Sequence, residues 1–447
     1  MTTYGSATRP VSQVPGGQAT RSARIALWTM LLASAALMAA WSFAVPVFEG
    51  PDEPTHWKYA HYLRERHALP VSEPSCPEAA QPPLYYLLIA PLAVDVTMPP
   101  IGYVGEEFGK RHLLFPPRVY QNATGDLKLY WPFRLARLVS VLMSVFAVWF
   151  CVLAGTEASG SQWTGLLVGG LVAFWPMFSF RGMNVSNDSL VVTLCALTLY
   201  LTVRLIRRGF TWRIGVMAAL VAVGAFLTKI NAVALGVALL LALISEKGPW
   251  RAKLLRAFVL GAAMLVIVGP WLIRNEHLYG EALAQMAQLN AARGMIERHS
   301  LFSNYFLTDF PVLLISSFIG TFGWMSLPLP IWGYLAYFSG LIFAGTCWIG
   351  ASLKRRVDFR LSTILACTIV LNLVGIIQMN FSQTQPQGRY LLATLPAIAL
   401  AMALGLESLP SWSRLRVMLT VGGLAVSNLI ILVCLVIPAY WPPVINQ

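Results

Sequence analysis

Long apolar runs separated by short polar connections dominate the chain. Residues 214–245 form one apolar stretch that is broken only by Thr228-Lys229-Ile230-Asn231, which fits two short spans better than one. The predicted spans cover residues 25–45, 134–154, 163–180, 188–206, the two halves of 214–245, a run to about 273, one from about 330, 361–379, 391–406 and 417–437. Since about 20 apolar residues cross a bilayer as a helix, the pattern predicts an all-α polytopic membrane protein with about eleven transmembrane helices.

The polar segments predict how these spans are oriented. Lys and Arg are frequent in the connections on one side of the predicted spans, and such residues stay in the cytoplasm. This rule places a disordered tail (1–24) and the N-terminus inside, and the C-terminus outside. A single transmembrane domain (25–440) follows the tail, with outer loops at 46–133 and 274–329. Within these loops, the apolar segments 84–98 and 310–325 are predicted to be juxtamembrane helices on the outer face. The protein as a whole is expected in the plasma (inner) membrane.

Composition and charge exclude several classes of function. The chain is 57% hydrophobic and only 11% charged, and its net charge of +13 comes largely from orienting Lys and Arg, so no nucleic-acid partner is expected. Five of the six cysteines lie in apolar runs, and Cys76 in the first outer loop is expected to react with a thiol reagent added from outside. No nucleotide-binding or metal-helix motif is present. An activated donor must therefore already be in the membrane.

Pro51-Asp52-Glu53-Pro54-Thr55-His56 follows the first span directly, and charge is scarce elsewhere. Pro54 fits the first turn of a helix that continues to Arg66, and the dipole at its start favours ionised Asp52 and Glu53. A fixed carboxylate at the membrane edge suits a general base that deprotonates a hydroxyl. The alternative is a plain helix cap, which the pattern alone does not exclude.

Other polar clusters fall on the same predicted face. Gln81-Pro82-Pro83-Leu84-Tyr85 opens the first juxtamembrane helix or is a plain entry to it, and Asn184, Asn187 and Asp188 crowd the start of the fourth span or cap it. The cationic candidates and their aromatic neighbour are Lys229, Arg274, Arg389 and Tyr390. Each cation fits a phosphate contact or an anchor at the lipid headgroups. Together these clusters predict a pocket on the outer face.

The order of these motifs resembles the C-class glycosyltransferases, membrane enzymes that use polyprenyl-phosphate-linked sugars. The resemblance extends over residues 20–440. It rests on Asp52-Glu53, Gln81-Pro82-Pro83-Leu84, Arg134 and Arg137, the Asn-x-x-Asn-Asp turn at residues 184–188, Thr228-Lys229, and Gly388-Arg389-Tyr390 followed by Leu395-Pro396. The sequence around Asp52 and Arg389 is similar to that of a bacterial branch called domain of unknown function 2142. The resemblance implies that Asp52 is the base that activates the acceptor. Gln81 departs from the pattern, because relatives carry Lys or His there to contact phosphate.

The resulting hypothesis is a membrane glycosyltransferase. It would move a sugar from a polyprenyl-phosphate donor to a hydroxyl acceptor on the outer face, with inversion. Asp52, Glu53 and His56 are the expected catalytic residues: Asp52 takes the acceptor proton, and Glu53 and His56 support its position and charge. Gln81, Tyr85, Asn184, Asn187, Asp188, Lys229, Arg274, Arg389 and Tyr390 are the expected substrate-binding residues. The chain ends soon after the last span, which favours a small or lipid-linked acceptor. A divalent metal ion and the cations are alternatives for the charge at this site, so no metal ligands are assigned. The alternatives are a transporter or flippase of lipid-linked glycans, and a non-catalytic assembly subunit.

Overall fold

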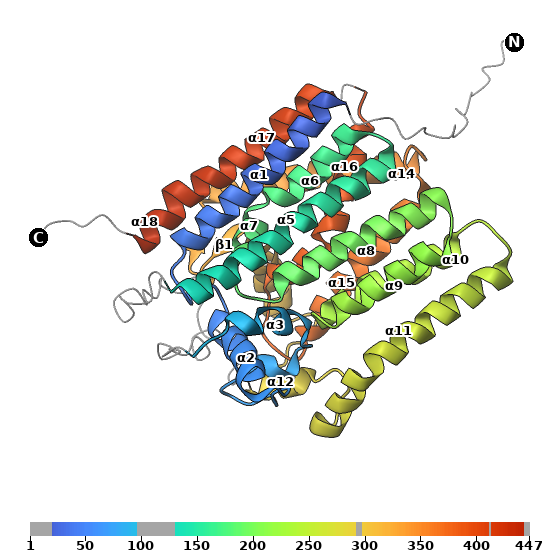
Figure 1. Cartoon of the computed structure of the whole chain (residues 1–447). Helices are drawn as coiled ribbons and strands as arrows, with labels where there is room; N and C mark the ends of the chain where they lie inside the picture. The colour runs from blue at the N-terminus through green and yellow to red at the C-terminus, as the bar shows by residue number, and fades with distance from the viewer. Residues whose placement is uncertain (1–19, 96–129, 292–296, 411–412, 442–447) are drawn as a thin grey trace, which may run out of the picture.

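The computed structural model describes residues 20–95, 130–291, 297–410 and 413–441. Most of the predicted tail 1–24, the middle of the first outer loop and the end of segment 84–98 lie outside these ranges. The described part is a bundle of long helices with short helices gathered at one end (Figure 1). An all-α polytopic membrane fold was predicted, and the structure confirms it.

Among the described residues, eight helices belong to segments long enough to cross a membrane. They are α1 (Arg21–Ala44), α5 (Trp131–Ser159), α8 (Asp188–Arg208), α11 (Trp250–Tyr279), α14 (Ile331–Leu353), α15 (Phe359–Met379), α16 (Leu395–Glu407) and α17 (Arg414–Ile431). The shorter helices are α2 (Glu53–Arg66), α3 (Leu84–Ile89), α6 (Gln162–Ala173), α7 (Pro176–Met183), α9 (Trp212–Phe226), α10 (Val233–Ser245), α12 (Gln285–Ala291), α13 (Phe310–Gly320) and α18 (Ile437–Tyr440). Short turns of helix are η1 (Pro77–Ala80), η2 (Ala90–Leu92), η5 (Ile230–Ala232), η6 (Tyr305–Asp309), η7 (Gly388–Thr394) and η8 (Leu432–Val436). Strands β1 (Thr321–Phe322) and β2 (Leu327–Pro328) pair antiparallel.

Each predicted span corresponds to an apolar helix or helix pair. Among the described residues, eight helices are long and apolar enough to cross a membrane, and there are nine if the bent pair α6–α7 is one span. Helices α9 and α10 are shorter and meet at the break around Lys229, as the sequence predicted. The protein is thus a multi-pass membrane protein, while the count of eleven crossings stays a prediction. Helix α11 continues to Tyr279, past the predicted end of its span near residue 273.

The break between α6 and α7 shows how the bundle core tolerates a bend of 66°. Pro176 cannot continue the hydrogen-bond ladder of α6, so carbonyl groups are left without helical partners. The buried Asn428 of α17 donates to the carbonyl of Phe174 at 3.2 Å and to the hydroxyl of Ser179 at 2.8 Å, and it accepts from the indole of Trp41 at 3.0 Å. This amide joins α1, α7 and α17, and the bend is therefore built into the fold.

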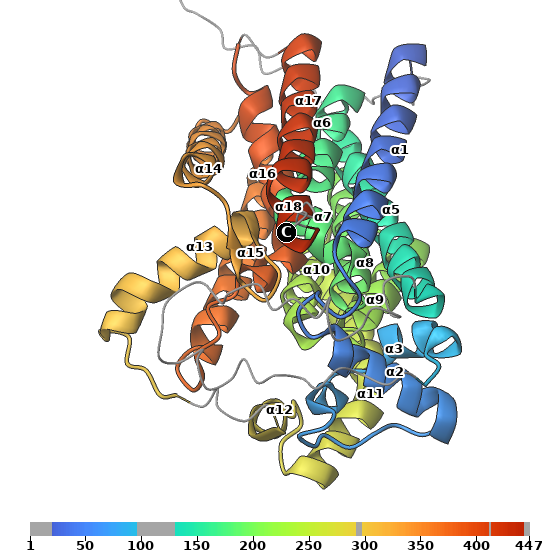
Figure 2. The same cartoon turned by 90° about the vertical axis from the view of Figure 1, so that its left-hand side faces the viewer.

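Helices α2, α3 and α12 lie together at one end of the bundle (Figure 2). Helix α2 has Pro54 in its first turn and ends at Arg66, and the C-cap residue His67 adopts the left-handed conformation with φ 49°. The sequence prediction of a helix ending at Arg66 is confirmed. The backbone N–H of Leu84 donates to the carbonyl of Leu227 at 3.1 Å, so the start of α3 is fixed against the end of α9. The first outer loop and the Lys229 break are therefore neighbours.

Candidate functional site

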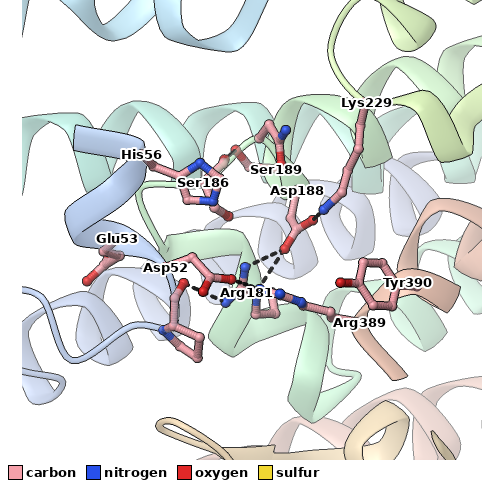
Figure 3. Close-up of polar contacts among 12 residues, drawn as sticks. Asp52, Glu53, His56, Arg181, Ser186, Asp188, Ser189, Lys229, Arg389 and Tyr390 are labelled. Atoms are coloured by element: carbon pink, nitrogen blue, oxygen red, sulfur yellow. Dashed lines mark hydrogen bonds and ion pairs between the residues drawn. The ribbon is translucent and has the colours of Figure 1, made fainter. Parts of the chain in front are cut away.

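Asp52 occupies the N-cap position of α2 but does not cap the helix with its side chain. Its backbone lies in the left-handed region with φ 66°, a conformation that Asp and Asn tolerate better than most residues. The carboxylate instead pairs with the guanidinium of Arg389, which belongs to η7 far along the chain (Figure 3). The capping alternative therefore does not describe what this carboxylate does.

A second acid beside this pair is held by two cations. Asp188, the first residue of α8, accepts from Arg181 of α7 at 2.6 Å and from the ammonium of Lys229 at 2.5 Å. Arg181 also donates to the carbonyl of Pro51 at 3.2 Å, which places the two acids in one network (Figure 3). The side chain of Asn187, the N-cap of α8, makes no capping hydrogen bond either.

The network carries an excess of positive charge beside an aromatic ring. Arg389 and Lys229 lie over the ring of Tyr390, at 5.3 Å and 5.5 Å from its centroid. The cluster contains three cations (Arg181, Lys229 and Arg389) against two carboxylates (Asp52 and Asp188). Cations that are only partly neutralised in a mostly buried site attract an anion such as phosphate.

Glu53 has different ion-pair and hydrogen-bond partners from its neighbour Asp52. Its carboxylate forms a two-point ion pair with Arg137 of α5 at 2.6 Å and 2.8 Å, and both side chains are fully buried. It also accepts from the backbone N–H groups of Gly50 at 3.1 Å and Val185 at 3.0 Å. Glu53 is fully buried and holds the loop before Asp52 against the turn before α8, while its expected part in catalysis, support of Asp52, stays a prediction.

His56 and Glu78 form a buried layer next to Asp52. His56 Nδ1 lies 2.8 Å from the hydroxyl of Tyr86, and the Tyr86 ring stacks on Tyr59 with centroids 3.9 Å apart. Glu78 accepts from the amide of Gln81. These contacts fix both groups without giving either one a charged partner.

Burial and charge move the pKa values of these three groups in different directions. Burial lowers the pKa of His56 to about 3 and raises that of Glu78 to about 7. Burial also acts to raise the pKa of Asp52, but the positive charge of Arg389 and Arg181 outweighs it, so this pKa lies below its usual value. At neutral pH Asp52 is therefore ionised, and His56 is a neutral imidazole.

Among the described residues, Asp52, His56 and Glu78 form a group that could hold a metal ion. One ligand atom from each residue lies within 4.8 Å of the other two. Carboxylate oxygens and a neutral imidazole nitrogen are ordinary ligands of divalent ions, so the residues fit such an ion chemically.

Comparison with known proteins identifies the family. Residues 127–398, more than half of the chain, match the family described as predicted membrane protein (DUF2142). The chain belongs to this family. The matched region includes Asp188, Lys229 and Arg389, but it begins at residue 127, after Asp52. No curated protein matches the sequence.

Solved structures share the fold at low sequence identity. ArnT from Cupriavidus metallidurans, bound to undecaprenyl phosphate, is 14% identical with a TM-score of 0.50, covering 92% of this chain and 73% of ArnT. The archaeal oligosaccharyltransferase AglB from Archaeoglobus fulgidus, in complex with an inhibitory peptide and a dolichol-phosphate, is 12% identical with a TM-score of 0.53, covering 91% of this chain. The chain spans only 55% of AglB. The DUF2142 protein therefore has the fold of these membrane glycosyltransferases.

Two predicted site residues of the DUF2142 protein lie outside the network. The hydroxyl of the fully buried Tyr85 pairs with Ser140 at 2.9 Å, inside the contact between α3 and α5, so it is not exposed to a substrate. Arg274 donates to the carbonyl of Pro70 at 2.6 Å and lies over the ring of Trp271. Both were predicted from sequence position alone, and the adjacent Tyr86 takes the place expected for Tyr85.

The predicted site residues Asn184, Asn187 and Gln81 lie close to the charged groups but take no part in their ion pairs. Asn187 donates to Gln81 and to the carbonyl of Thr228 at 3.1 Å, and it thereby ties α8 to the Lys229 break. Asn184 is fully buried beside Gly50, where an added Cβ would meet its side chain at 2.7 Å. Gln81 therefore takes part in a hydrogen-bond network with Asn187 and Glu78.

The structure adds residues that the sequence did not single out. Arg181 follows an apolar run and stands just before the Asn-x-x-Asn-Asp turn, and this position is the signal that could have revealed it. Glu78 stands three residues before Gln81 in a polar loop, where an acid is ordinarily solvated. Cys76, expected to be accessible in the same loop, is instead only 6% exposed, and burial raises its pKa to about 12.

Proposed function

We propose that this protein transfers a sugar from a polyprenyl-phosphate donor to a hydroxyl acceptor at the outer face of the plasma membrane. The observation that carries the proposal is the ionised Asp52 held beside a cluster in which cations outnumber acids. This arrangement offers a proton acceptor and a phosphate-binding group in one place. The fold supports the proposal, because solved relatives were captured with undecaprenyl phosphate and dolichol-phosphate.

The proposed reaction is one displacement at the anomeric carbon. Asp52 accepts the proton of the acceptor hydroxyl, the acceptor oxygen bonds to the anomeric carbon, and the bond from that carbon to the phosphate oxygen breaks. Attack opposite the leaving group inverts the configuration. The polyprenyl phosphate leaves with its additional negative charge, which Arg389 and Lys229 stabilise.

Arg389 has to serve two partners in this reaction. In the free protein it pairs with Asp52, and both side chains are partly accessible, at 13% and 24%. A donor phosphate competes with Asp52 for the guanidinium, because the fork of Arg matches either anion. Donor binding thus releases the base that the acceptor requires.

The charge distribution along α8 supports an outer location for the site. The helix begins at Asp188 in the network and ends at Arg207 and Arg208. Its 21 residues correspond to about 30 Å of helix, the thickness of the bilayer core. Basic residues at the far end favour a cytoplasmic position there, which puts the network outside and the N-terminus inside. We propose a small or lipid-linked acceptor, as the sequence predicted.

The test compares cell-surface glycans and polyprenyl-linked lipids by mass spectrometry. Cells that lack the protein are complemented with the wild type, with Asp52→Asn or with the control Glu65→Gln, an exposed acid on α2. A transferase predicts that a covalently attached sugar disappears in the null strain and with Asp52→Asn, while its donor lipid accumulates. A flippase predicts complete glycans trapped on the inner face, with no sugar missing from the acceptor. That second outcome would contradict the proposal.

A further inference from the structure

Three metal-ligating side chains meet beside the Asp52–Arg389 pair. They come from the N-cap of α2 (Asp52), its first turn (His56) and η1 (Glu78), and one ligand atom of each lies within 4.8 Å of the others. His56 and Glu78 are only 3% and 7% exposed, whereas the side chain of Asp52 is 24% exposed. His56 and Glu78 therefore form the buried side of the cluster, and solvent reaches it at Asp52.

Glu78 has no positive partner within ion-pair distance among the described residues. Its carboxyl group accepts from the neutral amide of Gln81 and, at 3.3 Å, from that of Gln288 on α12. A buried carboxylate without a counter-charge is costly. A bound cation supplies the charge that this side chain lacks.

His56 is oriented as a metal-ligating histidine requires. Its Nδ1 lies against the Tyr86 hydroxyl at 2.8 Å, and no hydrogen bond from the described residues reaches its Nε2. A histidine ligand commonly has one ring nitrogen held by a neighbouring group, which leaves the other to bind the ion. In the neutral tautomer whose Nδ1 carries the proton and donates to Tyr86, Nε2 keeps its lone pair for an ion.

We propose that Asp52, His56 and Glu78 bind one divalent cation, and that this ion replaces Arg389 as the counter-charge of Asp52. Two carboxylates with one imidazole suit Mn²⁺ or Zn²⁺ better than Mg²⁺, which prefers oxygen ligands alone. The ion and the guanidinium compete for one carboxylate and repel each other. Cation binding therefore frees Arg389 for an anion, and this last step rests on the proposed function, in which the anion is the donor phosphate.

Because of this exchange, ion binding to the cluster and phosphate binding to Arg389 favour each other. If the ion releases Arg389 for phosphate, then phosphate on Arg389 raises the affinity of the cluster for the ion by the same factor. Replacing Arg389 by a neutral residue removes both the competitor and a nearby positive charge. The affinity for the ion should therefore rise in Arg389→Gln, whereas loss of an ordinary supporting contact would lower it.

The test measures Mn²⁺ binding to the full chain in lipid nanodiscs after treatment with a chelator, from the electron paramagnetic resonance signal of free Mn²⁺. We expect one ion per wild-type chain, displaced by added Zn²⁺. Glu78→Gln and His56→Gln should each weaken binding by about 100-fold or more. Glu65→Gln, an exposed acid on the same helix as His56, is the matched control and should bind like the wild type. Arg389→Gln should bind the ion several-fold more tightly.

Two results would overturn the inference. One is the absence of bound Mn²⁺ in the wild type, or binding by Glu78→Gln at the wild-type affinity. The other is unchanged or weaker binding by Arg389→Gln, which would remove the exchange with Arg389. If His56→Gln does not fold, Glu78→Gln carries the test, because Gln has the shape of the protonated carboxyl group. The assay contains neither donor nor acceptor, so its failure leaves the transferase proposal to be judged on sugar transfer.

Discussion

Replacing Asp52 by Asn separates chemistry from stability at this site. The change keeps the size of the side chain and one oxygen that can accept from Arg389, but removes the basic oxygen. Loss of a general base costs about a hundred- to ten-thousand-fold in rate. Asp52→Asn should therefore reduce kcat for sugar transfer by that amount. The same change raises the excess of positive charge in the network, so the KM for the donor should stay the same or fall.

The structure predicts a small effect of Asp52→Asn on stability. The side chain makes no helix-capping hydrogen bond, so no cap is lost, and Asn adopts the left-handed backbone conformation at φ 66° as readily as Asp. The pair with Arg389 is partly exposed, which limits the loss to about 1 kcal/mol. Asp52→Ala is a poorer test, since the left-handed conformation adds about 1–2 kcal/mol for Ala.

The assay is sugar transfer by purified protein, measured together with its thermal unfolding midpoint. Glu65→Gln serves again as the control, because it removes an exposed carboxylate from the same helix. A near-normal kcat in a folded Asp52→Asn variant would refute the assignment of the base. A collapse of stability with an unchanged rate per folded molecule would show that the carboxylate is structural.

Three further predictions follow from the same geometry. Arg137→Met leaves the buried carboxylate of Glu53 without a counter-charge, so it should lower the free energy of unfolding by about 3–5 kcal/mol. Thermal or denaturant unfolding measures this loss, and a loss below about 1 kcal/mol would contradict the importance of the pair. Arg389→Lys keeps the charge but loses the planar fork, so KM for the donor should rise clearly; wild-type kinetics would place the phosphate elsewhere. Cys76, with its pKa raised to about 12, should remain unlabelled by a membrane-impermeant maleimide at pH 7–8, whereas Ser75→Cys, at an exposed position, should be labelled in intact cells. Labelling of Ser75→Cys only after permeabilisation would invert the proposed orientation.

Local features of the sequence determined the elements that carry the site. The apolar runs, Pro54 and the break at Lys229 predicted the bundle, the start of α2 and the meeting of α9 with α10. These features act within a few residues, through span length, the fixed φ of proline and the cost of a charge in an apolar run. They also placed Asp52 and Arg389 at the same predicted face. They did not determine which groups touch.

Only the tertiary structure decided the partners of the charged groups. Asp52 and Glu53 are adjacent, yet Asp52 precedes the helix with a left-handed backbone and Glu53 is the first helical residue, so one carboxylate meets Arg389 and the other meets Arg137 inside the bundle. Cys76 lies in a polar loop that the fold covers, which no local pattern reveals. Contacts between segments hundreds of residues apart depend on how the helices pack, and packing is a property of the whole chain.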